Sequence, residues 1–237
     1  MKKQILAAAL CLTTALGMTT PVTATVNATK TSEKKAVSKK KKSKMEIVES
    51  GYYVQPTSEY SDTVYVYFWA KIKNNDKSKS IEFPEITATA KNDAGTILAT
   101  TTQTGNYIAP KDTAILMSQM DTGSEEPTSV EIKTKKPTLV KHKSIKTSQF
   151  EVSNVAEVTD SIYSSKVTGE LTYNGKKDLN SVAVSAIYKS GDQIVFVSQT
   201  YLDNIDGKST TAFEITPWTA SDLPAHDSVE VVAQHWY

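Results

Sequence analysis

The chain has 237 residues, of which 39% are hydrophobic, and its 27 basic residues are all lysines set against 26 acidic residues. This length suffices for one large domain or for two domains of about 100 residues each. Because arginine is absent, the chain lacks the planar fork that binds phosphates and guanine edges through two hydrogen bonds, which argues against nucleic acid as a partner.

Residues 1–28 have the pattern of a secretory signal peptide. Lys2 and Lys3 give a positive start, an apolar run follows, and Pro21 ends that run ahead of small residues. Two V-x-A motifs predict cleavage after Ala24 or Ala28. The run is too short and too rich in threonine and alanine for a good membrane span, so no transmembrane segment is expected after signal cleavage.

The only cysteine, Cys11, lies inside this apolar run. A lipoprotein signal requires a small residue before the cysteine, and Leu10 stands there instead. Removal of the signal peptide would leave no thiol, which excludes disulfides, thiolate metal sites and cysteine nucleophiles. An exported chain without disulfides suggests a bacterial, Gram-positive source.

Residues 29–44 predict a disordered, lysine-rich tether. They carry eight lysines and one glutamate, a net charge of +7, and too few apolar side chains to fold alone. With +2 on residues 1–28 and +1 on the whole chain, residues 45–237 carry −8. One interpretation of the tether is a solvated spacer. The other is electrostatic attachment to anionic cell-wall polymers or lipid headgroups.

Residues 45–136 predict a first β-sandwich module, here called module one. The stretch 65–73, YVYFWAKIK, alternates with a period of two and is rich in aromatic and β-branched residues, which is typical of a strand. Asn92–Gly95 predicts the turn of a hairpin. Further strands are expected at 45–48, 86–90, 96–102, 113–117 and 129–132.

The same order of strands and turns is repeated in residues 149–237, here called module two. A lysine-rich linker at 137–148 separates the modules, and its Leu139, Val140 and Ile145 could extend a strand. The chain is therefore interpreted as a tandem repeat of antiparallel β-sandwiches. The predicted equivalences are Val167, Gly169 and Leu171 for Phe68, Ala70 and Ile72; Val182, Val184 and Ala186 for Ile86, Ala88 and Ala90; Asp206 to Lys208 for Pro110-Lys111; and Ala212-Phe213 for Ala114-Ile115.

Module two resembles the FxLYD domain family of secreted bacterial proteins. The residues that carry the resemblance are Gly169, Leu171, Asn174, Val182, Val184, Ile187, Tyr188, Gly191, Gly207, Lys208, Phe213 and Val229. The resemblance implies an immunoglobulin-like sandwich outside the cell, and it implies no catalytic residues.

The aromatic residues of the 65–73 strand form the candidate ligand-binding site. Module two has Val167, Gly169 and Leu171 in one phase of the equivalent strand and charged or polar residues in the other. Since burial of unpaired charge is costly, Phe68, Ala70 and Ile72 are expected to face the core. Tyr65, Tyr67 and Trp69 would then form a stripe on the outer face, suited to stacking on sugars or an apolar partner. The alternative is that module two, or the segment 45–53, covers the stripe.

No catalytic, cofactor or metal motif stands out. The chain has three histidines, and His226 beside Asp222 and Asp227 could ligate a metal, although an acidic loop is the simpler interpretation. Asp203 and Asp206 suggest a calcium loop, but the residues that follow lack its spacing and its terminal glutamate. The sequence lacks the metalloprotease, nucleophile-elbow, phosphate-loop and dinucleotide motifs. We therefore expect a non-catalytic extracellular or cell-wall-associated binding or adhesion protein of the bacterial envelope. Its partners would be an anionic cell-wall polymer on the tether and a carbohydrate or protein on module one. The alternative is a secreted hydrolase, or an accessory module that serves one.

Overall fold

The computed structural model describes residues 26–28, 43–55, 57, 62–141, 144–158, 165–217 and 223–236. The expected signal peptide up to residue 25 and the tether from 29 to 42 lie outside the described residues. So do Cys11, His142 and Asp222.

Nearly all the regular structure is β-strand, as the sequence predicts, and the described residues contain no α-helix. The one helical element among them is the 3-10 turn η1, Thr147–Gln149. The strands of module one are β2 Met45–Val54, β3 Tyr65–Asn74, β4 Ser80–Glu82, β5 Glu85–Lys91, β6 Ile97–Thr104, β7 Tyr107–Ile108, β8 Thr113–Asp121 and β9 Ser129–Thr134. β1 Val26–Ala28 precedes module one, and β10 Thr138–Val140 lies between the modules. The strands of module two are β11 Phe150–Val158, β12 Lys166–Tyr173, β13 Leu179–Ser190, β14 Gln193–Ile205, β15 Thr210–Ile215 and β16 Ser228–His235.

Each module is a sandwich of two sheets, and the two modules share one strand order. We number the sheets I (β6–β5–β9), II (β1–β2–β3–β8), III (β14–β13–β16) and IV (β11–β12–β15), and a small side sheet joins β10–β4–β7. In module one β3 pairs with β8 and β5 with β9, and in module two β12 pairs with β15 and β13 with β16. These are the pairings of strands B with E and C with F in immunoglobulin-like sandwiches. The predicted fold of two tandem sandwiches is confirmed.

The repeat extends to single hydrogen bonds. The N–H of Asn75 donates to the Lys44 carbonyl, and the N–H of Asn174 donates to the Gln149 carbonyl, so each module closes the start of its first strand in the same way. The left-handed backbone of Lys111 (φ 63°) recurs at Lys208 (φ 60°). This second match confirms the predicted equivalence of the two lysine turns.

The strand pairing corrects two of the predicted equivalences. Ala70 pairs with Leu116 whereas Gly169 pairs with Phe213, so Phe213 is the counterpart of Leu116 and not of Ile115. In the equivalent strands β5 and β13, Lys91 pairs with Ser129 and Lys189 with Ser228, and each of these lysines follows a β-bulge. Ile86 therefore matches Val184 and not Val182. Position 169 requires glycine, because a Cβ there would lie 2.5 Å from the Phe213 ring.

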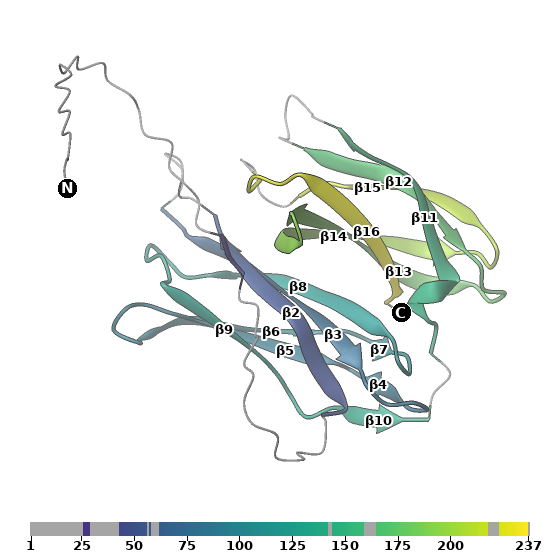
Figure 1. Cartoon of the computed structure of the whole chain (residues 1–237), viewed down its shortest axis with the longest axis horizontal. Helices are drawn as coiled ribbons and strands as arrows, with labels where there is room; N and C mark the ends of the chain where they lie inside the picture. Colours follow the sequence, from purple (N-terminus) through teal and green to yellow (C-terminus); the bar gives the residue numbers. More distant parts are fainter. Residues whose placement is uncertain are drawn as a thin grey trace, which may run out of the picture.

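The two sandwiches stack face to face, so the four sheets form layers in the order I, II, III, IV (Figure 1). Sheets I and II enclose one apolar cluster. A second cluster holds the core of module two and also takes in Tyr53, Tyr67, Trp69, Ile115 and Met117 from sheet II. Sheet III is thus covered on both faces, and β13 is buried over most of its length, whereas β5 alternates between buried and half-buried residues.

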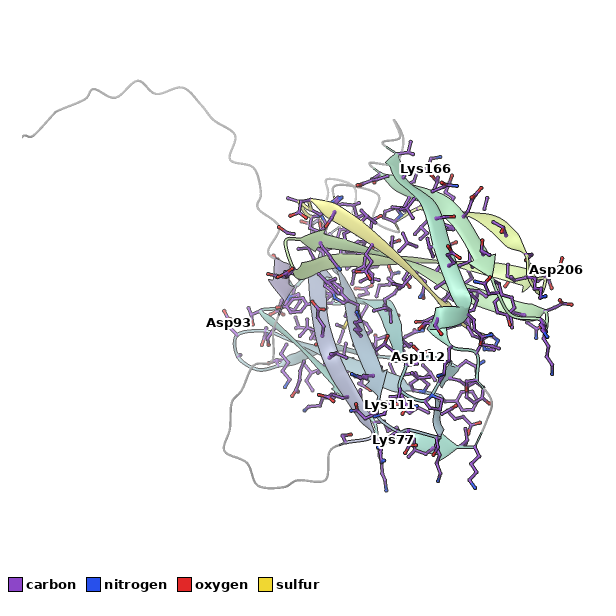
Figure 2. The ribbon with its side chains drawn as sticks, turned by 45° about the vertical axis from the view of Figure 1, so that its right-hand side comes forward. Lys77, Asp93, Lys111, Asp112, Lys166 and Asp206 are labelled. Atoms are coloured by element: carbon purple, nitrogen blue, oxygen red, sulfur yellow. The ribbon has the colours of Figure 1, made fainter. Side chains whose placement is uncertain are left out.

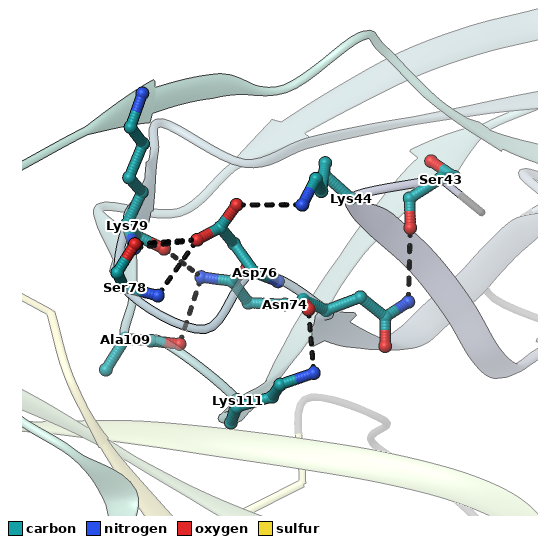
Figure 3. A network of polar contacts seen from close by, with 9 residues as sticks. Ser43, Lys44, Asn74, Asp76, Ser78, Lys79, Ala109 and Lys111 are labelled. Carbon is teal, nitrogen blue, oxygen red and sulfur yellow. Dashed lines mark hydrogen bonds and ion pairs between the residues drawn. The ribbon is translucent and has the colours of Figure 1, made fainter. Parts of the chain in front are cut away.

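A polar network fixes the end of β3 (Figure 3). The buried amide of Asn74 donates to the carbonyls of Lys79, Ile108 and Ala109. The carboxylate of Asp76 accepts the N–H groups of Ser78 and Lys79 at 2.9 Å each and lies 3.0 Å from Lys44 Nζ. These contacts hold the pKa of Asp76 well below its usual range, because each of them favours the ionised carboxylate.

The segment predicted as a linker is built into the fold. Its β10 pairs antiparallel with β4, and Ile145 packs against the second apolar cluster. Asp112, in the turn before β8, then accepts the N–H of Thr147 at 2.7 Å and its hydroxyl at 2.5 Å. Figure 2 shows Asp112 and Lys111 on the module-one side of this crossing. The carboxylate anchors the point at which the chain enters module two.

Candidate functional site

The 65–73 strand has the predicted phase. Val66, Phe68, Ala70 and Ile72 are buried in the cluster between sheets I and II. Tyr65, Tyr67 and Trp69 are on the opposite face of sheet II, as predicted, because a strand places alternate side chains on opposite faces.

The prediction that this stripe is an exposed platform is wrong. Only 3% of Tyr67 and 1% of Trp69 is exposed, and the half-buried Tyr65 packs against the same cluster. Phe196 of β14 lies edge-on to Tyr67, with ring centroids 5.5 Å apart. Burial raises the pKa of Tyr67 to about 12, and its hydroxyl donates to Gln55. Module two covers the stripe, which was the alternative, so these residues form the interface between the modules.

Trp69 is accommodated by a glycine on the neighbouring strand. Gly51 of β2 pairs with Trp69, and a Cβ at Gly51 would lie 2.6 Å from the indole ring. The indole Nε1 is buried, and within the described part of the chain it has no hydrogen-bond partner. The ring therefore contributes packing area at the interface.

A different set of aromatic side chains, two exposed and two half-buried, lies where the modules meet. We call it the aromatic groove, and it consists of Phe83, Tyr107, Tyr201 and Trp236. Phe83 and Tyr107 come from module one, with ring centroids 6.0 Å apart, and Tyr201 and Trp236 from module two, 5.2 Å apart. Phe83 is 60% exposed and Tyr201 is 40% exposed.

Trp236 lines two depressions beside the aromatic groove. One, of about 170 Å³, lies between Trp236 and Phe83 and includes Asn106. The other, shallower and of about 390 Å³, lies beside Tyr201 and is edged by Asn180 and Asp203. Rings flanked by amide and carboxylate groups can stack on an apolar surface of a ligand and accept or donate hydrogen bonds at its edge.

The backbone around Phe83 is strained. Its φ of 47° is in the left-handed region that bulky side chains rarely adopt, and Pro84 further disfavours helical backbone angles at this position. Two hydrogen bonds to the β6–β7 connection hold this conformation: Phe83 N–H to the Asn106 carbonyl at 2.7 Å, and Gly105 N–H to the Pro84 carbonyl at 2.8 Å. An exposed bulky ring on strained backbone indicates a functional site, because such strain clusters at binding and catalytic sites.

The sequence interpretation missed this groove. Trp236 is in the last residues of module two and Phe83 in a short connection of module one, so their proximity depends on how the modules stack. The one local signal is Phe83-Pro84 between two strands, an apolar ring where a turn residue is usual.

His226, a candidate metal ligand, contacts a carboxylate of β11 instead. His226 Nε2 lies 3.0 Å from Glu157 Oε1, and Ser165 Oγ donates to the same oxygen at 2.6 Å. The carboxylate stands between the hydroxyl and the imidazole, so His226 is not placed to take a proton from Ser165. Among the residues that the structure describes, no three His, Cys, Asp or Glu side chains gather as metal ligands; Asp222 is not among them.

The fold and the groove define an all-β protein of two stacked sandwiches with exposed aromatic side chains at their junction. No family model matches the chain, and no curated protein matches it. The resemblance to the FxLYD family rests on the module-two residues given above and stays a prediction. Within the described ranges, none of the elements is a helix long and apolar enough to cross a membrane.

Proposed function

We propose that this protein is a non-catalytic binding protein of the bacterial cell envelope that holds a carbohydrate chain in the aromatic groove. The observation that carries the proposal is Phe83, a ring 60% exposed on a left-handed backbone and paired with Tyr107 beside the depression that Trp236 borders. Sugar rings offer an apolar face for stacking and hydroxyl groups for Asn106, Asn180 and Asp203.

The position of the protein in the envelope is part of the same proposal. The N-terminal pattern supports export, and the basic tether supports attachment to anionic wall polymers, which higher salt should release. Mass spectrometry of the secreted chain is expected to find Thr25 or Thr29 as the first residue. Cleavage after Ala24 would keep β1, which pairs with residues Gly51–Tyr53 of β2, and cleavage after Ala28 would remove it. Cytosolic chain that keeps Met1 would contradict export.

The carbohydrate proposal is tested with purified cell-wall polysaccharides and host glycans on a solid support. Phe83→Ala and Tyr201→Ala are expected to reduce retention of the full chain at least about tenfold, since an exposed ring at a binding hot spot carries much of the affinity.

Two matched controls separate the groove from general surface effects. Ile97→Ala removes an apolar side chain with the same exposed fraction as Phe83, 60%, and Val155→Ala one close to Tyr201, 41% against 40%. Both controls should bind like the parent chain. Equal retention of all four variants, with unchanged melting, would overturn the proposal.

A further inference from the structure

A cavity lies where the chain crosses from the segment after β10 into module two. Its volume is about 610 Å³, within the range of small-molecule sites. Lys141 and Ile145 line it from the segment after β10, and Tyr173, Lys176 and Lys177 line it from the end of β12 and the loop that follows. The segment between the modules and module two therefore form its wall together.

Three lysines, all of them exposed to solvent, line this cavity, and no acidic residue of the described part of the chain lines it. Among the described residues none of the three lysines has an ion pair, whereas Lys44, Lys91 and Lys166 do. The nearest carboxylate along the chain, Asp178, accepts the Gly207 N–H at 2.9 Å and does not line the cavity. Like charges on lysines that line one cavity repel one another, and an anion bound among them would relieve that repulsion.

The wall that carries these lysines is held firmly. Tyr173 is 1% exposed and stacks on Phe150, with ring centroids 5.2 Å apart. On the other side, Ser144 Oγ donates to Ser80 Oγ at 2.7 Å, next to the pairing of β10 with β4. The Lys176 backbone packs so closely on Gly207 that a Cβ there would lie 2.5 Å from the Lys176 carbonyl oxygen. Packing and hydrogen bonds therefore hold the backbone around the cavity in place.

We propose that this cavity is a binding site for an anion that carries several negative charges, with Lys141, Lys176 and Lys177 as its cationic contacts. Lysine binds phosphate and carboxylate groups as a point charge with three rotatable donors, without the planar geometry that arginine imposes. The site takes charge-dense ligands, and Tyr173 and Ile145 provide an apolar floor. It is separate from the aromatic groove, and the proposal stands without a carbohydrate ligand.

The test is calorimetric titration of the full secreted chain with tripolyphosphate and with citrate. Lys176→Gln/Lys177→Gln is expected to weaken binding about tenfold, and Lys141→Gln, in the segment between the modules, should weaken it as well. A larger affinity for tripolyphosphate would identify phosphate groups as the ligand, and a larger affinity for citrate would identify carboxylates. Binding should fall when ionic strength rises from about 0.01 M to 1 M, because the screening length drops from about 30 Å to 3 Å.

The control is Lys133→Gln/Lys135→Gln, which removes the same charge from exposed lysines at sheet I. Because the tether also attracts anions, this control shows how much of the effect is general charge. Weakening confined to the cavity variants, with unchanged melting, supports the site. Equal weakening by both double variants, or no saturable binding by the parent chain, would overturn it.

Discussion

The side chain of Gln234 in β16 takes the place of a strand beside Ile115 in β8. The Ile115 N–H donates to Gln234 Oε1 at 2.7 Å, and Gln234 Nε2 donates to the Ile115 carbonyl at 2.9 Å. β8 is the edge strand of sheet II, so its outer backbone groups have no neighbouring strand to pair with. Both hydrogen bonds are buried, and they tie module two to the backbone of module one.

Replacing Gln234 with alanine should therefore destabilise the junction. The change leaves a buried N–H and a buried carbonyl of Ile115 unpaired, at a cost of about 1–3 kcal/mol in the free energy of unfolding. Urea unfolding measures this loss. Gln103→Ala, on the edge strand β6, should stay within about 0.5 kcal/mol of the parent chain. If the two variants unfold alike, the Gln234 contact does not stabilise the junction.

The repeat allowed the phase of each strand to be predicted, but not every register. Moving a strand by two residues returns every side chain to the same face, so Val182 and Val184 fit the apolar pattern of Ile86 equally well. The bulge before Lys91 and Lys189 decides the register, and an apolar pattern does not reveal it. The one-residue error at Phe213 is different, because a shift of one residue moves every side chain of β15 to the other face of the sheet. The correct match was hidden because the pair Ala70 and Leu116 in module one is replaced by the pair Gly169 and Phe213 in module two.

The sequence contains a signal of the stacking of the modules, namely apolar residues on one outer face of each module. Thr89 and Lys133 on the outer face of sheet I are replaced in sheet III by Ile187 and Val232. The outer face of sheet II, in turn, has the aromatic stripe where sheet IV has charged and polar residues. Two apolar outer faces, one in each module, indicate two surfaces that cover each other. The aromatic groove could not be found this way, since it arises only after they have joined.

The fit between Gly51 and Trp69 predicts a coupled pair of substitutions. Gly51→Ala places a Cβ 2.6 Å from the indole and should cost about 1–3 kcal/mol, the usual range for overpacking. Trp69→Phe removes the contacting ring atoms, so the same Gly51→Ala change should cost much less in that background. A double-mutant cycle by denaturant unfolding measures the difference. Additive effects would show that the two residues do not press on each other.

The covered stripe itself is tested by Tyr67→Thr/Trp69→Thr. Truncation of one buried large aromatic side chain costs about 3–5 kcal/mol, so the double variant should lose several kcal/mol of stability or fail to fold. Tyr65→Thr, at the half-buried end of the stripe, should lose less. Melting temperatures of the three chains check this order. Unchanged melting of the double variant would mean that module two does not cover the stripe in solution.

The contacts of Asp76 predict a dependence of stability on acid pH. Its folded pKa is depressed by the N–H groups of Ser78 and Lys79 and by Lys44. The stabilisation is therefore complete above the unfolded pKa of about 3.9 and is lost as pH falls from there toward the folded pKa. Asp76→Asn should be less stable than the parent chain at neutral pH, and the difference should shrink on acidification below about pH 4. A difference that stays constant across the acid range would contradict this linkage.

Phe83 predicts a conflict between stability and binding. Glycine adopts a φ of 47° without strain, whereas phenylalanine in the left-handed region costs about 1–3 kcal/mol. The 60% exposed ring also loses little burial when it is removed. Phe83→Gly is thus expected to raise or preserve the melting temperature while it abolishes retention on the polysaccharides that the parent chain binds. Phe83→Ala separates the two effects, because it removes the ring but keeps most of the strain, so it should lose binding without the gain in stability. A Phe83→Gly chain that melts well below both other chains would show that the ring is needed for packing, and the case for a functional strained residue would then fail.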